Sequence, residues 1–397
     1  MTLQLGDESA AVPITPPSAM PAPSPQSPLP SLRLVGLEEE LLLVDAETLL
    51  PLPIAGQILA AGPRVLPDGT VLESEVKNEQ LEVVSPPLLA YDDILSAVLA
   101  GRRAADDAAR SHGARAVAMA TAADECTPHL AHTPRYDLMQ KRFALTMDEQ
   151  LTCGLHVHVT IGSPEEGVAV LDRIRPWLPV LLALSANSPF WRGMDSGFAS
   201  YRYQAWSRWP GTGPYELFGS AAGYADSIRE ILATGVALDE GMIYFDARLS
   251  SHAPTIEVRI ADVCLAPEDA ATVAVLIRAL VERAVADWKA GTVADGVGTA
   301  LLRLASWRAS RWGLEQDLIN PLTHRPCAAR ACVVELLTHV QDHFASDEES
   351  DSIRRGVFKI LKRGNGATQQ RRMLADGLNA GAVVAGAVMR THSEPLW

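Results

Sequence analysis

The alternation of apolar and polar positions along the chain predicts six strands. They are segments rich in β-branched residues with stretches of period two, at residues 33–44, 71–84, 115–120, 153–161, 242–249 and 255–263. Apolar positions at helical spacing predict helices over 91–114, near 172–188, and over 223–234, 267–291, 330–345 and 350–362. Segment 198–220 is too irregular for a helix or a strand, and a loop of this length is more often functional than a mere connection.

The predicted strands do not alternate strictly with helices. The last two are joined by the short polar turn SSHAP, which suits a hairpin. We therefore expect an α+β fold in which helices pack on an antiparallel sheet. One face of such a sheet can stay open to solvent or to a ligand, and charged side chains of the strands can point there.

Composition narrows the class of protein. The formal charge of −14, from 34 basic and 48 acidic residues, disfavours nucleic acid as a partner. No segment approaches the ~18 uncharged apolar residues of a membrane-spanning helix, so we expect a soluble protein. The five cysteines are scattered and include no C-x-x-C pair, which fits a reducing cytoplasm better than a disulfide framework or a structural zinc site.

Residues 1–30 differ in composition from the rest of the chain. They hold eight prolines between Pro13 and Pro30 and lack the features of a signal or transit peptide. We expect a disordered proline-rich extension there. No second proline-rich linker and no repeat of fixed period follows, so residues 31–397 are expected to form a single domain.

The stretch LVGLEEELLLVD, residues 34–45, places carboxylates inside an apolar strand. Period two puts Glu38 and Glu40 on one face, roughly 7 Å apart, and Glu39 on the other. Cations would relieve the repulsion between the two carboxylates, and oxygen ligands suit Mg²⁺ or Mn²⁺. The solvated face of an edge strand would give the same pattern.

A second acidic strand, VLESEVKNEQLEVVSPP, adds four carboxylates and one lysine. The four are Glu73, Glu75, Glu79 and Glu82. Glu75 and Glu82 have opposite parity in the predicted strand, so they converge only if a bulge lies between them. Pairing of the acids with Lys77 across strands explains the pattern equally well.

Two further strands carry polar residues at alternate positions. In CGLHVHVTI, His156 and His158 share a face, which is a way to offer two imidazoles to one metal, as in a zinc or iron hydrolase; a structural role is the alternative. In TIEVRIADV, Glu257 and Arg259 share a face, either as a plain ion pair or as a metal ligand beside a phosphate clamp.

The irregular segment 198–220 carries Arg202 and Arg208 among its aromatic residues. These arginines could hold a carboxylate or a phosphate, or pair with tryptophan rings in a packed surface loop. The chain contains no phosphate-binding GxxxxGK[ST], no GxGxxG after a strand and no GxSxG. Taken together, the strands predict a sheet face that binds several metal ions and handles phosphate.

Six segments, taken as a set, resemble the glutamate–cysteine ligase type 2, or carboxylate–amine ligase, family. They are GLEEELLLVD, EQLEVVSPP, CGLHVHVTI, SYRYQAWSRWP, TIEVRIADVCL and WRASRWGLEQDLINP, and they occur in the family's order between about residues 33 and 375. The resemblance implies a glutamine-synthetase-like fold, a curved six-stranded antiparallel sheet that forms a funnel, with helices on its outer face. ATP would bind at one end of the funnel and the amino-acid substrates at the other.

The resemblance also implies metal ligands and substrate-binding arginines. The ligand positions of the wider superfamily correspond here to Glu38, Glu40, Glu82, His156 and Glu257, with Glu75 as a further candidate and His158 as a weaker one. Arg259 would clamp the γ-phosphate, and Arg202 would bind substrate or phosphate.

The implied reaction is ATP-dependent ligation of a carboxylate to an amine by a catalytic domain at residues 31–397. ATP, with Mg²⁺ or Mn²⁺, would phosphorylate the carboxylate, and an amine would then displace phosphate from the acyl phosphate. The simplest pair is glutamate with L-cysteine, which gives γ-glutamylcysteine for thiol biosynthesis. Four alternatives stay open: another acid and amine, a kinase, a metal-dependent hydrolase that uses His156 and His158, and a protein that binds ATP without turnover. Homo-oligomerisation is also open.

Overall fold

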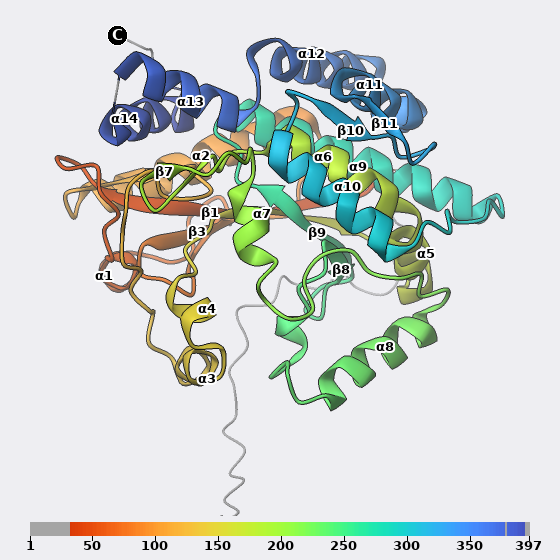
Figure 1. The fold of residues 1–397 in the computed structure, drawn as a ribbon, viewed down its shortest axis with the longest axis horizontal. Helices are drawn as coiled ribbons and strands as arrows, with labels where there is room; N and C mark the ends of the chain where they lie inside the picture. The colour runs from red at the N-terminus through yellow and green to blue at the C-terminus, as the bar shows by residue number, and fades with distance from the viewer. Residues whose placement is uncertain (1–31, 378, 394–397) are drawn as a thin grey trace, which may run out of the picture.

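The computed structural model describes residues 32–377 and 379–393. The proline-rich extension expected at residues 1–30 lies outside the described residues. The described part of the chain forms an antiparallel sheet with helices packed against it, so the expected α+β class is confirmed. Figure 1 shows the strands of this sheet crossing the middle of the molecule.

Six strands of the main sheet form one hydrogen-bonded path, in the order β2-β3-β1-β5-β9-β8, and a seventh, β4, pairs with β1. All of these pairings are antiparallel. The strands are β1 (Val35–Asp45), β2 (Val71–Ser74), β3 (Gln80–Val84), β4 (Ala114–Val117), β5 (Gly154–Thr160), β8 (Ala247–Leu249) and β9 (Thr255–Asp262). Two small hairpins lie apart from the sheet, β6 (Phe190–Trp191) with β7 (Met194–Asp195), and β10 (Asp317–Ile319) with β11 (Pro326–Ala328).

Two of the strand predictions were wrong in part. Segment 71–84 is not one strand, because Lys77 pairs with Leu130 instead of with the sheet, which separates β2 from β3. The six predicted segments therefore become seven strands. Segment 242–249 contributes only its last three residues to β8, since the chain before them forms part of the 3-10 helix η2 (Glu240–Met242) and an irregular connection.

The helices that were predicted are present with shifted ends, and several others join them. They are α1 (Ala55–Ala61), α2 (Tyr91–Arg110), α3 (Pro134–Phe143), α4 (Leu145–Asp148), α5 (Pro164–Ile174), η1 (Arg175–Trp177), α6 (Leu178–Ser185), α7 (Tyr201–Trp206), α8 (Ala221–Ala233), α9 (Pro267–Lys289), α10 (Thr299–Trp312), α11 (Ala329–Val340), η3 (Gln341–His343), α12 (Asp347–Arg363), α13 (Gly366–Gly377) and α14 (Ala380–Thr391). Among the described residues, no helix is both long enough and apolar enough to cross a membrane.

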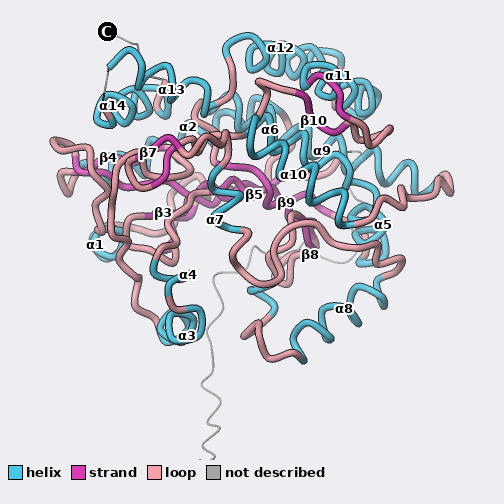
Figure 2. Tube along the Cα trace, in the orientation of Figure 1, coloured by secondary structure: helices cyan, strands magenta, loops and turns pink. Residues whose placement is uncertain are grey.

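One face of the sheet is covered by helices and the other carries the polar side chains. Helices α2, α6 and α9 pack directly on β3, β9 and β5 respectively. Figures 1 and 2 show α6, α9 and α10 above the sheet, whereas α3, α4 and α8 lie on the opposite side. The apolar face is thus buried, and the polar face is bordered by α3, α4 and α8.

Strand β5 shows how period two separates the two faces. Leu155, Val157 and Val159 are fully buried in the main core, which they share with α9. Each such side chain contributes about 1.5–3 kcal/mol when it is fully buried. Because successive side chains alternate, His156 and His158 are held on the polar face by the packing of their neighbours.

Glu39 lies on the helix-covered face, as its position between Glu38 and Glu40 predicted. Its carboxylate accepts hydrogen bonds from the Arg102 Nε and Nη2 at 2.9 and 2.6 Å, and both side chains are buried. Arg102 also donates to the carbonyl oxygens of Cys264 and Leu265, which follow β9. The pair thereby ties β1 to α2 and to the start of α9.

The segment 198–220, expected to be irregular throughout, begins with helix α7. The Ser200 Oγ accepts a hydrogen bond from the Tyr203 N–H at 3.3 Å and caps the helix. The Tyr203 hydroxyl in turn donates to Asp246 Oδ2 at 3.2 Å. Burial raises the pKa of Asp246 from 3.8 to about 7, and the hydrogen bond from Tyr203 and the charges of Arg202 and Arg303 offset only part of that rise.

Asp246 should therefore make stability depend on pH. Its folded-state pKa exceeds the unfolded value, so the protonated carboxyl contributes stability that is complete below the unfolded pKa and is lost as the pH rises through about 7. The melting temperature of Asp246→Asn relative to that of the parent protein should therefore rise as the pH increases from about 4 to about 8. Thermal unfolding across this range tests the prediction, and exposed Asp226→Asn is the control. A constant difference at all pH values would contradict it.

Candidate active site

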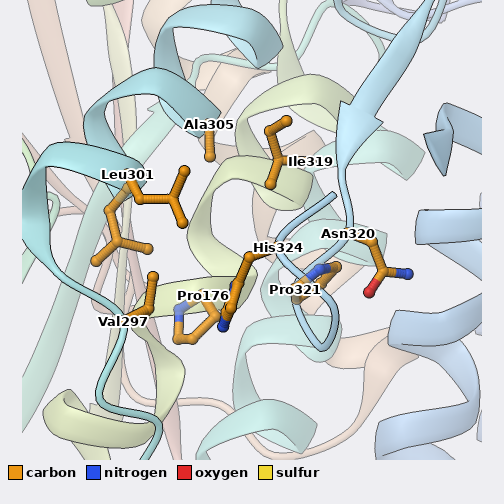
Figure 3. Close-up of a pocket in the computed structure, with 9 residues that line it drawn as sticks. Pro176, Val297, Leu301, Ala305, Ile319, Asn320, Pro321 and His324 are labelled. Carbon is orange, nitrogen blue, oxygen red and sulfur yellow. The ribbon is translucent and has the colours of Figure 1, made fainter. Parts of the chain in front are cut away.

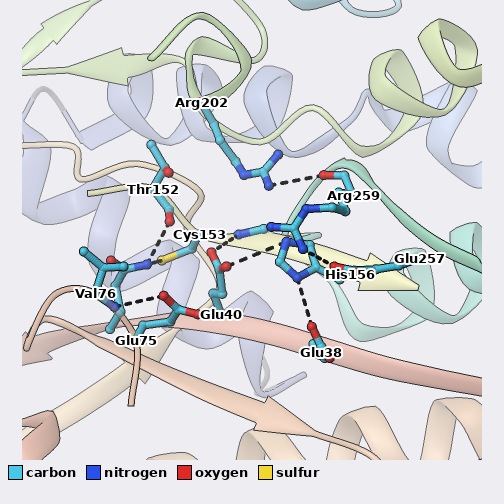
Figure 4. A network of polar contacts seen from close by, with 12 residues as sticks. Glu38, Glu40, Glu75, Val76, Thr152, Cys153, His156, Arg202, Glu257 and Arg259 are labelled. Carbon is cyan, nitrogen blue, oxygen red and sulfur yellow. Dashed lines mark hydrogen bonds and ion pairs between the residues drawn. The ribbon is translucent and has the colours of Figure 1, made fainter. Parts of the chain in front are cut away.

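The polar face brings the predicted ligands together from neighbouring strands. The register of β1 with β5 places Glu38 beside His156, and that of β5 with β9 places His158 beside Glu257. On the other side of β1, Glu40 faces Glu82 of β3. Figure 4 shows Glu38, Glu40, Glu75, His156 and Glu257 converging on one region of the polar face.

Glu38 lies at the centre of this region between two imidazoles. Its Oε2 is 3.0 Å from the His156 Nδ1, and its Oε1 is 3.0 Å from the His158 Nε2. Burial alone would raise the pKa of Glu38, but the adjacent histidines outweigh it and hold that pKa well below its ordinary value. Ligand atoms of Glu38, His156 and Glu257 all lie within 4.8 Å of one another, close enough to hold one metal ion.

The other acids form a second group, in which the pKa values are raised and not lowered. Burial raises the pKa of Glu82 well above its ordinary value, and the charges of Glu38, Glu75 and Glu40 raise it further. Burial, followed by the charge of Glu40, raises the pKa of Glu75 to about 8. Since no arginine or lysine in the described part of the chain forms an ion pair with either carboxyl, a cation would be needed to keep both ionised near neutral pH.

Glu75 reaches this group without the bulge that a single strand would have required. It follows the last residue of β2 and lies in the connection to β3, so strand parity does not constrain it. Its Oε2 accepts a hydrogen bond from the Val76 N–H at 2.9 Å. The register shift that does occur in the sheet lies between β5 and β9, near Leu155 and Val157.

Glu73 is a member of the group that the sequence analysis noted but did not select. The register of β2 with β3 places it directly opposite Glu82. Burial and the charge of Glu38 raise its pKa. Had segment 71–84 been recognised as a hairpin, the pairing of its two strands could have placed Glu73 opposite Glu82. Glu79, by contrast, lies elsewhere and binds the His129 backbone N–H and imidazole.

Two arginines border the ligands on the side of β8 and β9. Glu257 accepts hydrogen bonds from the Arg248 Nε at 2.7 Å and from Arg259 Nη1. Burial would raise the pKa of Glu257, but Arg259 and then Arg248 hold it well below its ordinary range. Sequence analysis missed Arg248, whose position opposite Glu257 follows only from the pairing of β8 with β9.

The chemistry of this donor set fits hard divalent cations. The candidate donors are mainly carboxylates, with the imidazoles of His156 and His158 beside Glu38; the carboxylates are those of Glu38, Glu40, Glu73, Glu75, Glu82 and Glu257. Oxygen-rich sets of this kind suit Mg²⁺ or Mn²⁺. The raised pKa values of Glu75 and Glu82 point the same way, because clustered carboxylates favour either protons or cations.

Comparison with known proteins identifies the family. Residues 34–393 match the model of glutamate–cysteine ligase family 2. The chain belongs to glutamate–cysteine ligase family 2. It is 49% identical over 368 residues to a Paenarthrobacter aurescens (strain TC1) protein whose name provisionally assigns it as glutamate–cysteine ligase 2-1, covering 91% of this chain and 96% of that one. A Streptomyces coelicolor relative, provisionally named glutamate–cysteine ligase 2, is 44% identical over 362 residues, covering 91% and 100%.

Solved structures share the fold at low sequence identity. A bifunctional glutathione synthetase from Pasteurella multocida superposes with a TM-score of 0.65 at 15% identity, covering 91% of this chain and 52% of that one. A glutamate–cysteine ligase from Francisella tularensis, solved in complex with AMP, gives a TM-score of 0.62 at 12% identity, covering 92% and 89%. These likenesses support the glutamine-synthetase-like fold.

Arg202 of this family 2 protein packs against strand β9, which carries two of the residues of the candidate site. It is 4% exposed, and its guanidinium donates to the carbonyl oxygens of Arg259 and Ile260 at 3.3 and 3.5 Å. Its Nη1 lies 3.8 Å from Asp262. The structure thus places Arg202 against the end of β9, where it supports the backbone that carries Arg259. Its expected role in binding substrate or phosphate stays a prediction.

Arg208 lies at the surface, apart from the ligand cluster. Its Nη1 is 2.5 Å from the Glu149 Oε2, and its guanidinium stacks 5.8 Å from the centre of the Trp191 ring. Of the two functions that the sequence left open, this contact is the packed arginine–tryptophan pair. The expected role of Arg208 toward a phosphate or a carboxylate stays a prediction.

A small cavity elsewhere in the protein offers none of this chemistry. It lies between η1, α10 and the β10–β11 hairpin, and Figure 3 shows it lined mainly by Pro176, Val297, Leu301 and Ile319. It contains no carboxylate, and no residue of the ligand cluster lines it. The polar face of the sheet is therefore the candidate active site.

Gly154 should be required for the shape of this site. Its N–H donates to the Glu40 Oε2 at 2.6 Å, and the Arg202 guanidinium lies directly over its Cα. A Cβ at this position would meet the Arg202 Cζ at 2.9 Å and its Nη2 more closely still. Because Arg202 is enclosed, Gly154→Ala should cost on the order of 1–3 kcal/mol of unfolding free energy and weaken metal binding by displacing Glu40.

Chemical denaturation and Mn²⁺ titration measure the two effects of Gly154→Ala. The matched control is Gly296→Ala, since Gly296 is exposed and its added Cβ meets no atom within 4 Å. Unchanged stability and unchanged Mn²⁺ affinity in Gly154→Ala would refute the close packing of Arg202 on this glycine.

Proposed function

We propose that this protein is an ATP-dependent carboxylate–amine ligase that uses Mg²⁺ or Mn²⁺. The observation that carries the proposal is the ligand cluster on the open face, where carboxylates and one imidazole adjoin Arg248 and Arg259. Membership of glutamate–cysteine ligase family 2 supports the reaction class. The AMP bound to the Francisella tularensis ligase supports a nucleotide substrate.

Across the open face, the charge changes from negative near the β2 edge of the sheet to positive near the β8 edge. The side of β2 and β3 contributes Glu73, Glu75 and Glu82, whereas the side of β8 and β9 contributes Arg248 and Arg259. Metal ions would be held at the acidic side and at the group formed by Glu38, His156 and Glu257. When bound, they would neutralise the negative charge of the phosphates.

Arg259 is the residue best placed to bind a transferred phosphoryl group. Its guanidinium contacts Glu257 through Nη1, while its Nε is buried without a hydrogen-bond partner. In the proposed reaction, a substrate carboxylate oxygen attacks the γ-phosphorus, and ADP leaves. The amine nitrogen then attacks the acyl carbon, phosphate departs, and the nitrogen loses a proton, which leaves an amide.

Glutamate and L-cysteine are the simplest substrate pair, with γ-glutamylcysteine as the product. The names of the relatives support this pair, and the same mechanism accommodates another acid or amine. A metal-dependent hydrolase that uses His156 and His158 is the alternative from another class of reaction, and it would turn over without ATP.

The reaction can be tested by trapping the activated acid. Incubation with Mg-ATP, glutamate and hydroxylamine should give a hydroxamate, because hydroxylamine attacks an acyl phosphate as an amine would. Replacing hydroxylamine by L-cysteine should give γ-glutamylcysteine with one ADP released per peptide bond. Mass spectrometry and coupled ADP detection measure both products.

The outcomes of this experiment separate the alternatives. Hydroxamate without dipeptide would retain the ligase mechanism and identify cysteine as the wrong amine. Turnover without ATP would favour a hydrolase, and a phosphorylated product that no amine consumes would favour a kinase. ATP binding without any product, across a panel of acids, would refute the ligase proposal.

Glu82→Gln should nearly abolish metal-dependent ATP turnover while the fold is retained. The substitution keeps the side chain's size but removes a charge from the acidic group, and we expect a loss on the order of 100-fold. Glu38→Gln should act likewise. ATP turnover at saturating Mg²⁺ and the melting temperature are the two measurements. Glu47→Gln, at an exposed position after β1, is the control. Activity close to that of the parent in Glu82→Gln would exclude Glu82 from the ligand set.

A further inference from the structure

Asp262, at the end of β9, faces the polar side of the sheet because of the register shift between β5 and β9. Period two alone would group it with Val258 and Ile260, which are buried in the core. Beyond the shift, however, Asp262 pairs with Gly154, which lies two residues before His156 on β5. Residues paired across two strands project to the same face, and a bulge can redirect a side chain in this way.

The Asp262 carboxylate is fully buried and accepts hydrogen bonds from three donors. Its Oδ2 accepts from the Asn187 N–H at 2.8 Å and from the Ser188 hydroxyl at 2.7 Å. Its Oδ1 accepts from the Ser200 hydroxyl at 2.8 Å. Each hydroxyl oxygen also accepts a backbone N–H of helix α7, so its own proton is left for Asp262. These bonds tie the segment before β6 and the start of α7 to the end of β9.

Arg202 is buried beside this carboxylate but does not close an ion pair with it. Its Nη1 lies 3.8 Å from the Asp262 Oδ1, beyond the ~2.7–3.2 Å that is usual for a hydrogen bond. Its bonds to the carbonyl oxygens of Ile260 and Arg259 are long, at 3.5 and 3.3 Å. Among the described residues, its Nε has no hydrogen-bond partner. A buried guanidinium with spare donors is unfavourable unless an anion pairs with it.

The Arg202 guanidinium also lies at the edge of the ligand cluster. A Cβ at Gly154 would collide with it, and the Gly154 N–H donates to the Glu40 Oε2 at 2.6 Å. Figure 4 shows Arg202 reaching toward the strand that carries Arg259. An oxyanion bound between Glu40 and Arg259 would therefore lie beside the spare donors of Arg202.

We propose that Asp262 is a positioning residue for Arg202. The Ser188 and Ser200 hydroxyls occupy its carboxylate, so Asp262 attracts the guanidinium without closing on it. Arg202 is thereby left available to an oxyanion of the substrates, which is either a phosphoryl group of ATP or the carboxylate of the acid. The identity of this ligand rests on the proposed function, whereas the arrangement of Asp262 rests on the hydrogen bonds alone.

Removal of the Ser200 hydroxyl tests this arrangement without any substrate. Ser200→Gly releases the Asp262 Oδ1, and glycine is still accepted at the N-cap of α7. The crystal structure of the whole protein with Ser200→Gly should show the Arg202 Nη1 at about 3 Å from that oxygen. Ser200→Thr, which keeps the hydroxyl, should keep the separation of 3.8 Å. An unmoved Arg202 in Ser200→Gly would overturn the positioning role.

Affinity measurements identify the oxyanion that Arg202 binds. Closure of Arg202 on Asp262 in Ser200→Gly should weaken binding of its ligand by about 10-fold or more, the scale of one hydrogen bond to a charged group. Isothermal titration with Mg-ATP measures binding of the phosphates, and the KM for glutamate in the hydroxylamine reaction measures binding of the carboxylate. A loss in one of them identifies the source. Unchanged values in both would overturn the role of Arg202 toward the substrates.

A double-mutant cycle separates an effect through Arg202 from a general change of packing. Arg202→Met removes the charge and keeps much of the length of the side chain. In that background, Ser200→Gly should cause no further loss of affinity. A loss of equal size in both backgrounds would show that Ser200 acts independently of Arg202. Ser346→Gly is the matched control, because Ser346 is an exposed N-cap serine of α12, and it should change neither affinity.

The positioning role and the proposed function fail separately. If Arg202 closes on Asp262 in Ser200→Gly but the parent protein forms no ligase product, only the proposed function is refuted. If the parent is an active ligase and Arg202 does not move in Ser200→Gly, only the positioning role is refuted. Should Ser200→Gly fail to fold, Ser188→Ala releases the Asp262 Oδ2 and allows the same measurements.

Discussion

Repulsion between carboxylates that the sheet forces together is the constraint on which this structure depends. The cluster places Glu40, Glu73, Glu75 and Glu82 near one another, and no lysine or arginine pairs with Glu75 or Glu82 in the described chain. In water, side chains bearing like charges would separate. Here the strands carry them at fixed registers, so the repulsion is relieved by protons or by cations. The scaffold must therefore be stiff enough to hold a group of charges that is unfavourable on its own.

That stiffness comes from the opposite face of the sheet. Alternate residues of β5 and β9 are buried against α6 and α9, and the buried pair of Glu39 with Arg102 ties β1 to α2. A one-residue slip of any central strand would move the apolar side chains into water and the carboxylates into the core. Core packing thus determines register, and register determines which acids are neighbours.

The arginines on the β8 and β9 side balance the acids and divide the face into two electrostatic regions. Glu257 lies at the boundary, where Arg248 and Arg259 hold it ionised, while Glu75 and Glu82 on the far side favour the protonated form. A phosphate chain with bound cations has the matching pattern, since its metal ions would lie over the acids and its oxygens over the arginines. The His158 imidazole contacts Glu38 on this face, and Arg202 donates to the backbone of β9.

The sequence by itself determined whatever depends on period two within one strand. It separated Glu38 and Glu40 from Glu39, placed both histidines on one face, and paired Glu257 with Arg259, because neighbouring side chains of a strand point to opposite faces. Its motifs also indicated the family.

Tertiary structure alone decided the contacts that join distant segments. Glu75 and Glu73 enter the acidic group because segment 71–84 is a hairpin and not one strand, and Arg248 meets Glu257 only through the pairing of β8 with β9. Likewise, Arg202 is buried and Thr255 supports His158 because of where the chain returns to the sheet. Local periodicity is a property of a few residues, whereas strand register and loop path depend on which distant surfaces bury one another.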